Sequence, residues 1–136
     1  MSSQARQIVD EMFVAFEAKD LERIVKTFSD DAVCIYHGTQ VMPAAKFKTS
    51  EGARMFFDFN LNALQVVYFN KTQFIEEGNT VVVLGNEHFI SNQDGSHIKN
   101  SWVQIYTVTN GLISRMEEFA TSATPEQYGG NDGGQA

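Results

Sequence analysis

The stretch Asn100–Phe119, NSWVQIYTVTNGLISRMEEF, predicts two strands that are joined by a turn at Asn110-Gly111. Asparagine and glycine both tolerate the positive φ angles of a tight hairpin turn, and apolar and polar residues alternate on either side of them. Alternation places Trp102, Gln104 and Tyr106 on one face of the first strand. Burying an amide between aromatic rings is costly unless it has a hydrogen-bond partner, so we expect a functional site on this face.

The composition predicts one domain that folds by apolar burial. The chain has 136 residues, which is enough for a core that needs no disulfide or metal. We expect this domain to span residues 1–123, because the segment 124–136 is polar and glycine-rich and can bury little apolar area. The lone cysteine, Cys34, lies in an apolar run and predicts a buried thiol in a reducing compartment, which we take to be the cytoplasm.

The charge pattern argues against several classes of partner. The net charge is -7 and no Lys/Arg cluster is present, so we expect neither nucleic acid nor an anionic membrane as a partner. No segment approaches the roughly 20 apolar residues that cross a bilayer. His37, His88 and His97 show no metal-ligand spacing, so we expect no metal, and no cofactor is implied. The expected partners are neutral or cationic small molecules, or another protein.

Helical periodicity is confined to the first half of the chain. A first helix ends near Lys19, and a second begins after the N-cap Asp20 and closes at Asp30-Asp31. A short strand over residues 32–37 and a loop over 38–48 follow. A third helix begins at the N-cap Ser50 and extends its buried side to Leu64.

From Gln65 onward the apolar period changes from about 3.6 to 2. This pattern predicts strands over residues 66–76 and 80–91, with turns at Gly78-Asn79 and Asp94-Gly95, followed by the hairpin. Gly85 predicts a bend or bulge within the second of these strands. The predicted fold class is therefore α+β, an antiparallel meander whose apolar face is covered by three N-terminal helices.

This order of elements resembles the NTF2-like superfamily, specifically its SnoaL-like and ketosteroid-isomerase-like branch. The stretches KDLERIVKTFSDDAV (19–33), VVVLGNEHF (81–89) and SWVQIYTVTNGLISRMEEF (101–119) carry the resemblance, which covers about residues 5–123. It implies a cone in which a curved antiparallel sheet encloses an apolar pocket, with the third helix as a lid. It also implies a homodimer through the outer face of the sheet. Isomerases, cyclases, dehydratases and non-catalytic adaptors all share this fold.

The resemblance allows the catalytic positions of two branches to be compared with this chain. In the isomerase branch the oxyanion tyrosine corresponds to Met12 of this chain, the general-base aspartate to Tyr36 and the second oxyanion acid to Gln104. None of these roles is retained, so isomerisation by that mechanism is not expected. In the cyclase branch a histidine corresponds to Gln104 and an aspartate to Glu118. Only the acid is retained in this chain, as a glutamate. Glutamine cannot shuttle protons, which leaves Glu118 as the proton carrier of that pair.

Whether Glu118 faces the pocket depends on the register of the hairpin. A two-residue turn pairs Gln104 with Glu117, whereas a three-residue loop from Thr109 pairs Gln104 with Met116 and turns Glu118 inward. An inward carboxylate among aromatic residues has a raised pKa, which suits a general acid or base. The alternative is that Glu118 faces solvent near the end of the sheet.

Glu87 is the second candidate carboxylate, because the other residues on its strand face are apolar. A two-residue turn at Asp94-Gly95 pairs Glu87 with Trp102, beside Gln104. Two carboxylates flanking an amide could position a substrate oxygen and move a proton. The alternative is a structural carboxylate that is anchored by the Trp102 indole N–H.

These residues predict a SnoaL-like enzyme that uses general acid/base chemistry on a neutral, apolar small molecule. Glu118, Gln104 and Glu87 are the candidate catalytic residues. The expected ligand-binding residues are Tyr36, Trp102, Tyr106, Phe89, Phe56, Phe57, Met12 and Met116. The alternative is a non-catalytic ligand-binding or dimerisation module. A homodimer is expected through the outer sheet face, which carries Val82, Leu84, Val103 and Ile105.

Overall fold

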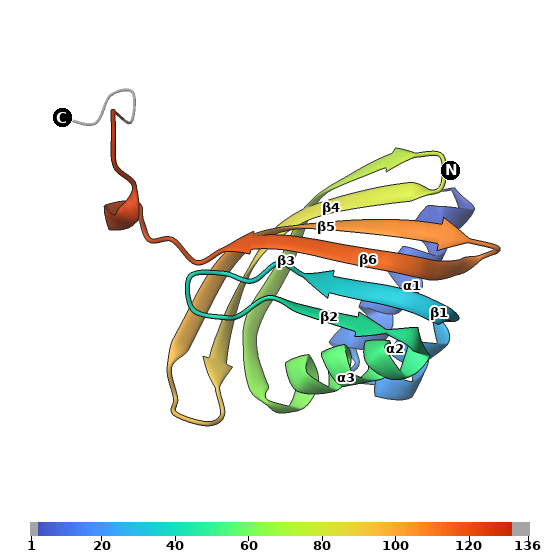
Figure 1. Ribbon diagram of the computed structural model, residues 1–136, viewed down its shortest axis with the longest axis horizontal. Coiled ribbons are helices and arrows are strands. Elements are labelled where there is room, and N and C mark those ends of the chain that lie inside the picture. The colour runs from blue at the N-terminus through green and yellow to red at the C-terminus, as the bar shows by residue number, and fades with distance from the viewer. Residues whose placement is uncertain (1–2, 132–136) are drawn as a thin grey trace.

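A computed structural model describes residues 3–131 of the chain (Figure 1). No helix in this range is long and apolar enough to cross a membrane. The elements are, in chain order, α1 (Gln4–Glu17), α2 (Leu21–Lys26), β1 (Phe28–Tyr36), β2 (Ala45–Lys48), α3 (Thr49–Asn62), β3 (Leu64–Glu77), β4 (Thr80–Ser91), β5 (His97–Thr109), β6 (Leu112–Thr121) and a single 3-10 turn, Pro125–Gln127.

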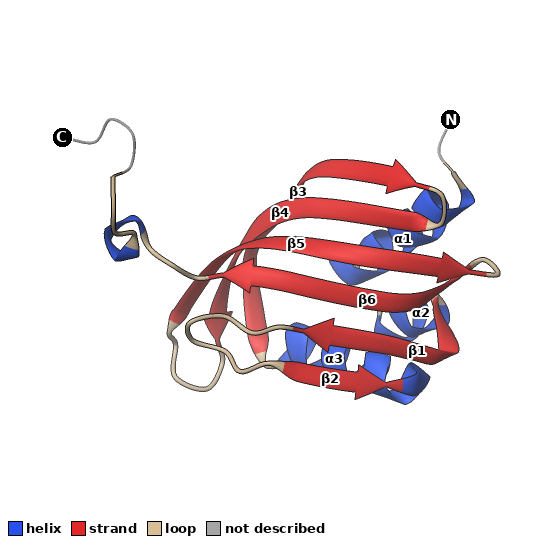
Figure 2. Cartoon of the chain, turned by 45° about the horizontal axis from the view of Figure 1, so that its top comes forward, coloured by secondary structure: helices blue, strands red, loops and turns tan. Residues whose placement is uncertain are grey.

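All six strands form one sheet in the order β2-β1-β6-β5-β4-β3 (Figure 2). The meander of β3, β4, β5 and β6 is antiparallel, as the change of period predicts. The prediction of an antiparallel sheet is wrong at one point, because β1 pairs with β6 in parallel. This parallel pair brings Tyr36 opposite Glu118.

The boundary between α2 and β1 differs from the prediction. The helix does not close at Asp30-Asp31 but ends at Lys26, and the strand begins at Phe28. Thr27 is the residue at which the helix gives way to the strand. Its hydroxyl donates to the Ile24 carbonyl at 2.6 Å, and its own carbonyl accepts from Ile113 N–H at 2.8 Å. That second bond ties the chain to β6 immediately after the helix.

The predicted loop over residues 38–48 contains a short strand. Its last four residues form β2, which pairs antiparallel with β1 at the edge of the sheet. The strand runs directly into α3, so the N-cap is Lys48 and not the predicted Ser50, and no side chain caps the helix. Leu64, which the helical pattern included, is the first residue of β3. β1 and β2 therefore separate α3 from the pair α1 and α2, so the three helices are not consecutive in the chain.

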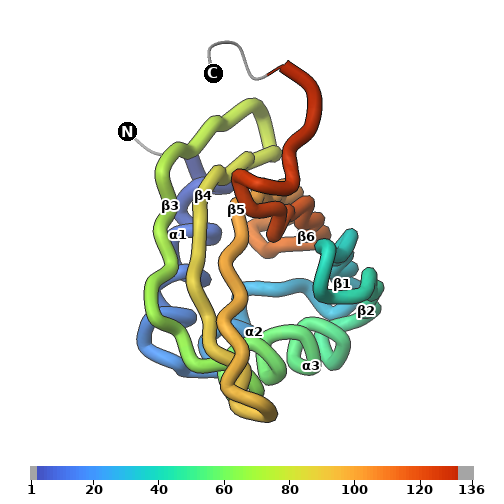
Figure 3. Tube along the Cα trace, turned by 90° about the vertical axis from the view of Figure 1, so that its left-hand side faces the viewer, coloured from blue at the N-terminus to red at the C-terminus, as the bar shows by residue number. Residues whose placement is uncertain are grey.

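The helices cover the inner face of the curved sheet. Figure 3 shows the sheet curling, with α1 against the side of β3 and β4 and α3 below β1 and β2. In the described residues α1 contacts β4, β5 and β6, and α3 contacts β1, β2 and β3. Val9, Met12, Phe13 and Phe16 form the buried stripe of α1. Their spacing of three and four residues is the one predicted for a helix with a single apolar face.

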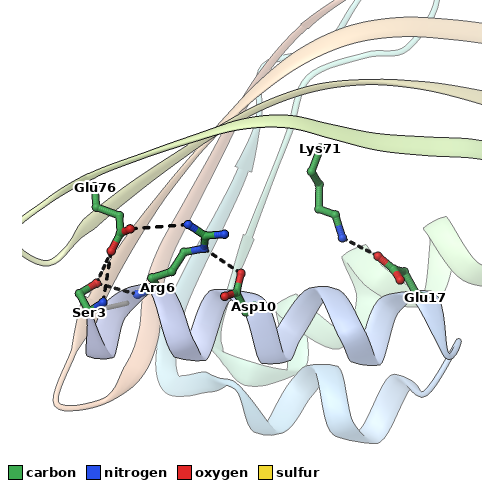
Figure 4. Close-up of polar contacts among 6 residues, drawn as sticks. All are labelled: Ser3, Arg6, Asp10, Glu17, Lys71 and Glu76. Atoms are coloured by element: carbon green, nitrogen blue, oxygen red, sulfur yellow. Dashed lines mark hydrogen bonds and ion pairs between the residues drawn. The ribbon is translucent and has the colours of Figure 1, made fainter. Parts of the chain in front are cut away.

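Polar contacts also join α1 to β3 (Figure 4). Glu76 accepts a hydrogen bond from the Ser3 hydroxyl and lies 3.6 Å from the Arg6 guanidinium, and Lys71 pairs with Glu17. Partly exposed pairs of this kind each contribute about 0–1 kcal/mol. The apolar stripe therefore supplies most of the energy that holds α1 on the sheet, and the ion pairs fix its position along β3.

Gly85 allows a tryptophan to lie flat on the sheet. It pairs with Trp102, and a Cβ at this position would lie 2.3 Å from the tryptophan ring and 2.1 Å from the Asn70 carbonyl oxygen. The register shift in this region lies between Lys71 and Gln73 on the neighbouring strand β3. The prediction of an irregularity at Gly85 is thus confirmed for the strand pair, and the reason for glycine is close packing.

We expect Gly85→Ala to destabilise the fold by about 3 kcal/mol or more, because an overpacked core must shift backbone or a large ring. Denaturant unfolding followed by far-UV circular dichroism measures the loss. Gly129→Ala is the matched control, since a Cβ there meets nothing within 4 Å. Equal stability of the two variants would show that Trp102 has room to move.

Candidate functional site

A cavity of about 220 Å³ lies between the helices and the inner face of the sheet. Most of its lining is apolar, and five residues contribute side-chain carboxyl or amide groups to it: Asn60, Glu87, Asn100, Gln104 and Glu118. The other lining residues are Met12, Phe13, Phe16, Tyr36, Met42, Pro43, Ala45, Phe47, Phe56, Phe57, Phe59, Leu64, Phe69, Phe89, Ile98 and Tyr106.

A bulge in the β5–β6 hairpin determines which glutamate faces this cavity. The turn has two residues, as predicted, with φ angles of 52° at Asn110 and 83° at Gly111. The register then shifts, because Val108 pairs with Ile113 but Thr107 pairs with Arg115, which leaves Ser114 without a partner residue.

Beyond the bulge Gln104 pairs directly with Glu118. Both predicted registers, with Glu117 and with Met116, are therefore wrong. The bulge has the effect that the three-residue loop was expected to have, since Glu118 lines the cavity. Glu117 lies on the opposite face, where its carboxylate pairs with His37 at 2.6 Å.

Gln104 links a phenol to the Glu118 carboxyl. The Tyr106 hydroxyl donates to Gln104 Oε1 at 2.6 Å, and Gln104 Nε2 donates to Glu118 Oε1 at 3.1 Å. All three side chains are buried. The amide on the aromatic face therefore has a partner at each end, and its orientation is set because only the oxygen can accept from Tyr106.

The environment of Glu118 raises the pKa of its carboxyl. Burial is the main cause, and the hydrogen bond from Gln104 opposes it. Tyr36 lies opposite Glu118 on β1 and also lines the cavity. Burial and the nearby Glu118 charge raise the pKa of Tyr36 to about 12, so this phenol stays protonated and can donate a hydrogen bond.

Glu87 forms a second polar pair, with Asn100. The predicted partner Trp102 is wrong, because Ile90 pairs with His97 and five residues, 92–96, connect β4 to β5 where a two-residue turn was expected. Glu87 consequently pairs with Asn100, whose Nδ2 donates to Glu87 Oε2 at 2.7 Å. Burial raises the pKa of Glu87, the Glu118 charge raises it further, and the bond from Asn100 opposes both.

The predicted anchor for Glu87, the Trp102 indole, is not used. Its Nε1 is buried without a hydrogen-bond partner among the described residues, and so is Asn100 Oδ1. The Trp102 ring stacks on Phe69, with 4.9 Å between the ring centroids, and does not line the cavity. Met116 is fully buried in the core and does not line it either. The prediction of both residues as ligand-binding is therefore not supported by their positions.

The other predicted residues come together at the cavity: Tyr36, Tyr106, Phe89, Phe56, Phe57 and Met12. The sequence analysis missed Asn100, although alternation places it on the same strand face as Gln104. It also missed Phe13 and Phe16, which belong to the apolar stripe of α1. Phe69 was missed because the bulges in β3 interrupt its alternation.

The histidines and the cysteine lie away from the cavity lining. His37 stacks on Phe119, and His88 hydrogen-bonds to His97 at 2.8 Å. Among residues 3–131 no group of three or more His, Cys, Asp or Glu side chains has the geometry to hold a metal ion. Cys34 is buried, and burial raises the pKa of its thiol to about 12.

The buried carboxyls make stability depend on pH. A carboxyl whose pKa is higher in the folded than in the unfolded chain favours folding when protonated, and this contribution is lost as pH rises through the folded-state value. We therefore expect the free energy of unfolding to fall between about pH 5 and pH 9, by about 1.4 kcal/mol for each unit of upward shift. Chemical denaturation at a series of pH values measures it.

Substitution separates this effect from the general charge of the protein. Glu87→Gln and Glu118→Gln should each flatten the pH dependence and increase stability at pH 9 relative to the unsubstituted chain. Glu77→Gln removes an exposed carboxylate and should leave the slope unchanged. A slope that all three variants share with the parent would assign the dependence to other groups.

Comparison with known proteins places this geometry in a family. A family model of the SnoaL-like domain matches residues 9–116, whereas no curated protein sequence matches significantly. An NTF2-like protein from Burkholderia xenovorans superposes with a TM-score of 0.77, at 18% identity over 88% of this chain and 91% of that one.

Two similar structures were solved with ligands. The RV0760c protein of Mycobacterium tuberculosis in complex with estradiol-17beta-hemisuccinate gives a TM-score of 0.72, at 21% identity over 87% of this chain and 94% of that one. TerC co-crystallised with polyporic acid gives 0.70, at 20% identity over 86% and 91%. Identities this low establish the fold alone. The family match covers most of the chain, and the chain therefore belongs to the SnoaL-like family, within the NTF2-like fold.

Proposed function

We propose that this protein is an enzyme that uses Glu118 as a general base or acid on a mainly apolar small molecule bound in the cavity. The observation that carries the proposal is a buried carboxyl that faces the cavity and has a raised pKa, with Gln104 as its one side-chain hydrogen-bond donor among residues 3–131. Such a group exchanges protons near neutral pH, which is the range where general acid/base catalysis is most effective. The reaction class is that of the isomerases, cyclases and dehydratases.

The hydrogen-bond chain from Tyr106 supports a reacting role for Glu118. Gln104 Nε2 occupies one carboxyl oxygen, Oε1, and the chain makes no side-chain hydrogen bond to Oε2 among the described residues. Since Gln104 is itself fixed by Tyr106, the carboxyl is held in one orientation. A fixed base with a free oxygen can take a proton from a substrate carbon or hydroxyl and return it to a neighbouring atom.

Glu87 is placed to anchor the substrate and not to share the proton transfer. Its partner Asn100 and the Glu118 partner Gln104 are four residues apart on β5, which is about 13 Å along a strand. No hydrogen bond joins the two carboxyls. We assign Glu87 and Asn100 to binding at one end of the cavity, and Tyr36 to hydrogen bonding beside Glu118.

The ligands of the structural neighbours are consistent with an apolar small molecule. Estradiol-17beta-hemisuccinate and polyporic acid are the compounds named for RV0760c and TerC. The cavity of this chain offers a mainly apolar surface to the body of such a molecule, and its few polar groups would fix the orientation.

A second function, binding without chemistry, is favoured by one observation. Gln104 occupies the position at which the resembling cyclases have a histidine, and an amide transfers no proton. In that case the Tyr106–Gln104–Glu118 chain would only satisfy buried polar groups.

Glutamine substitution tests the catalytic proposal. In a screen of apolar ketones, enols and hydroxy compounds, we expect Glu118→Gln to lower turnover by about 10²–10⁴-fold while substrate affinity changes little. The amide keeps the shape but cannot carry a proton. Glu77→Gln should retain full activity. Turnover that survives Glu118→Gln would overturn the proposal, and binding without turnover in the unsubstituted chain would favour the second function.

We also propose that the protein forms a homodimer through the outer face of the sheet. Val82, Leu84, Val103 and Ile105 are only partly buried there, and Phe119 is 46% exposed on the same face. Exposed apolar patches of this kind are typical of protein interfaces. Light scattering at micromolar concentration should give twice the 15.2 kDa of one chain, and Val103→Lys should shift the mass toward the monomer. A monomer mass for the unsubstituted chain would contradict the dimer.

A further inference from the structure

We propose that the ligand of this cavity carries a protonated amine, which binds at Glu87 and Asn100. The inference rests on the proposed function for the identity of the site and adds the chemical class of its ligand. The sequence analysis predicts a neutral substrate, and this inference replaces it with a cationic one. A cationic ligand is still among the neutral or cationic partners that the net charge favours.

The first argument is an imbalance of charge in the cavity lining. Two carboxyl groups line it, and no Lys, Arg or His does. Neither Glu87 nor Glu118 belongs to an ion pair among residues 3–131, and the only side-chain donors to them are the neutral amides of Asn100 and Gln104. Glutamate is rarely this buried without a cationic partner. A cation on the ligand would supply the missing countercharge.

The second argument is an unused acceptor beside Glu87. Asn100 is 7% exposed, and its Nδ2 donates to Glu87 while its Oδ1 has no partner. A buried polar atom without a hydrogen bond destabilises the protein, because it has lost its contact with water and gained no partner. An ammonium has several N–H donors and no acceptor, so it could bond to the Glu87 carboxylate and to this amide oxygen together. A carboxylate ligand could satisfy neither group.

The third argument is the aromatic surface around Glu87. Ten of the 21 lining residues are aromatic. Phe69 is directly opposite Glu87 on β3, and Phe89 follows it on the same face of β4, so both lie next to the proposed site. Aromatic faces attract ammonium groups electrostatically, and the attraction is stronger when water is excluded. The same rings would cover the apolar body of the ligand.

The test uses three probes that share one apolar body: 2-phenylethylamine, 2-phenylethanol and 3-phenylpropanoate. Isothermal titration calorimetry at pH 8 should show the amine binding at least about tenfold more tightly than the alcohol, and the carboxylate binding least. Equal affinity for amine and alcohol, or preference for the carboxylate, would overturn the inference.

Substitution of Glu87 tests whether its carboxylate is the group that binds the amine. Glu87→Gln should remove the amine preference, so that amine and alcohol bind with similar affinity, while the far-UV spectrum stays unchanged. Glu77→Gln should leave all three affinities unchanged. An amine preference that survives Glu87→Gln would overturn the assignment of the site to Glu87.

A pH series on the unsubstituted chain keeps the inference testable if Glu87→Gln does not fold. Alkyl amines stay protonated below about pH 10. Amine affinity should therefore rise from pH 5 to pH 8.5 as carboxyl groups in the lining ionise, whereas alcohol affinity should not. The other titratable groups that line the cavity are Glu118, Tyr36 and Tyr106. Amine affinity that is constant over this range would overturn the inference.

These outcomes are distinguishable from failure of the proposed function. Equal binding of amine and alcohol together with turnover that depends on Glu118 would remove the amine and leave the enzyme. An amine preference that depends on Glu87, with no turnover of any compound, would leave a binding site for amines and remove the catalytic role of Glu118.

Discussion

The register of β5 against β6 is the constraint on which the site depends. Side chains alternate across a strand, so a slip of one residue moves each of them to the opposite face. The bulge at Ser114 introduces one such slip close to the turn, and it brings Glu118 inward and Glu117 outward. The Ser114 hydroxyl lies 2.9 Å from that of Thr109 and donates to the Thr107 carbonyl at 3.2 Å, which holds the bulge in place.

The bulge also explains how the hairpin carries opposite chemistry on its two faces. On the outer face Glu117 meets His37 and Arg115, and the hydrogen bond from His37 is the main reason that its pKa is lowered. On the inner face burial raises the pKa of Glu118. Two adjacent glutamates of the same sequence are thus driven in opposite directions by the face on which each lies.

Much of the fold is predictable from the sequence because it is encoded locally. The stripe of α1, the change of period near Gln65 and the Asn110-Gly111 turn each depend on neighbouring residues, and the structure has all three. The errors occur where a distant strand determines the outcome. β1 begins early because Thr27 bonds to Ile113 of β6, and β2 exists because β1 offers it an edge. The residues next to Thr27 and β2 in the sequence do not indicate these contacts with distant strands.

The sequence predicts which residues face the cavity better than it predicts which of them pair across neighbouring strands. Alternation alone places Gln104, Glu87 and Tyr106 on the inner face, and the structure agrees. The partner of Glu87 was mispredicted, since Asp94-Gly95 resembles a two-residue turn but lies within a five-residue loop, residues 92–96. Gly95 N–H in this loop bonds to the carbonyl of Ser91, the last residue of β4. Because the loop is longer than expected, Glu87 pairs with Asn100 and not with Trp102. Its hydrogen-bond donor is therefore an amide and not an indole.

Glutamine at position 104 has a consequence for how the site would respond to pH. A histidine in this place would titrate in the same range as a buried glutamate, and the two groups would share their protons. Gln104 does not titrate, and the Tyr106 phenol to which it bonds has a pKa raised well above its usual value by burial. The hydrogen-bond chain that orients Glu118 therefore keeps the same protonation state across the neutral range. Among Tyr106, Gln104 and Glu118, only Glu118 gains or loses a proton there, and the non-titrating amide keeps its carboxyl in one orientation.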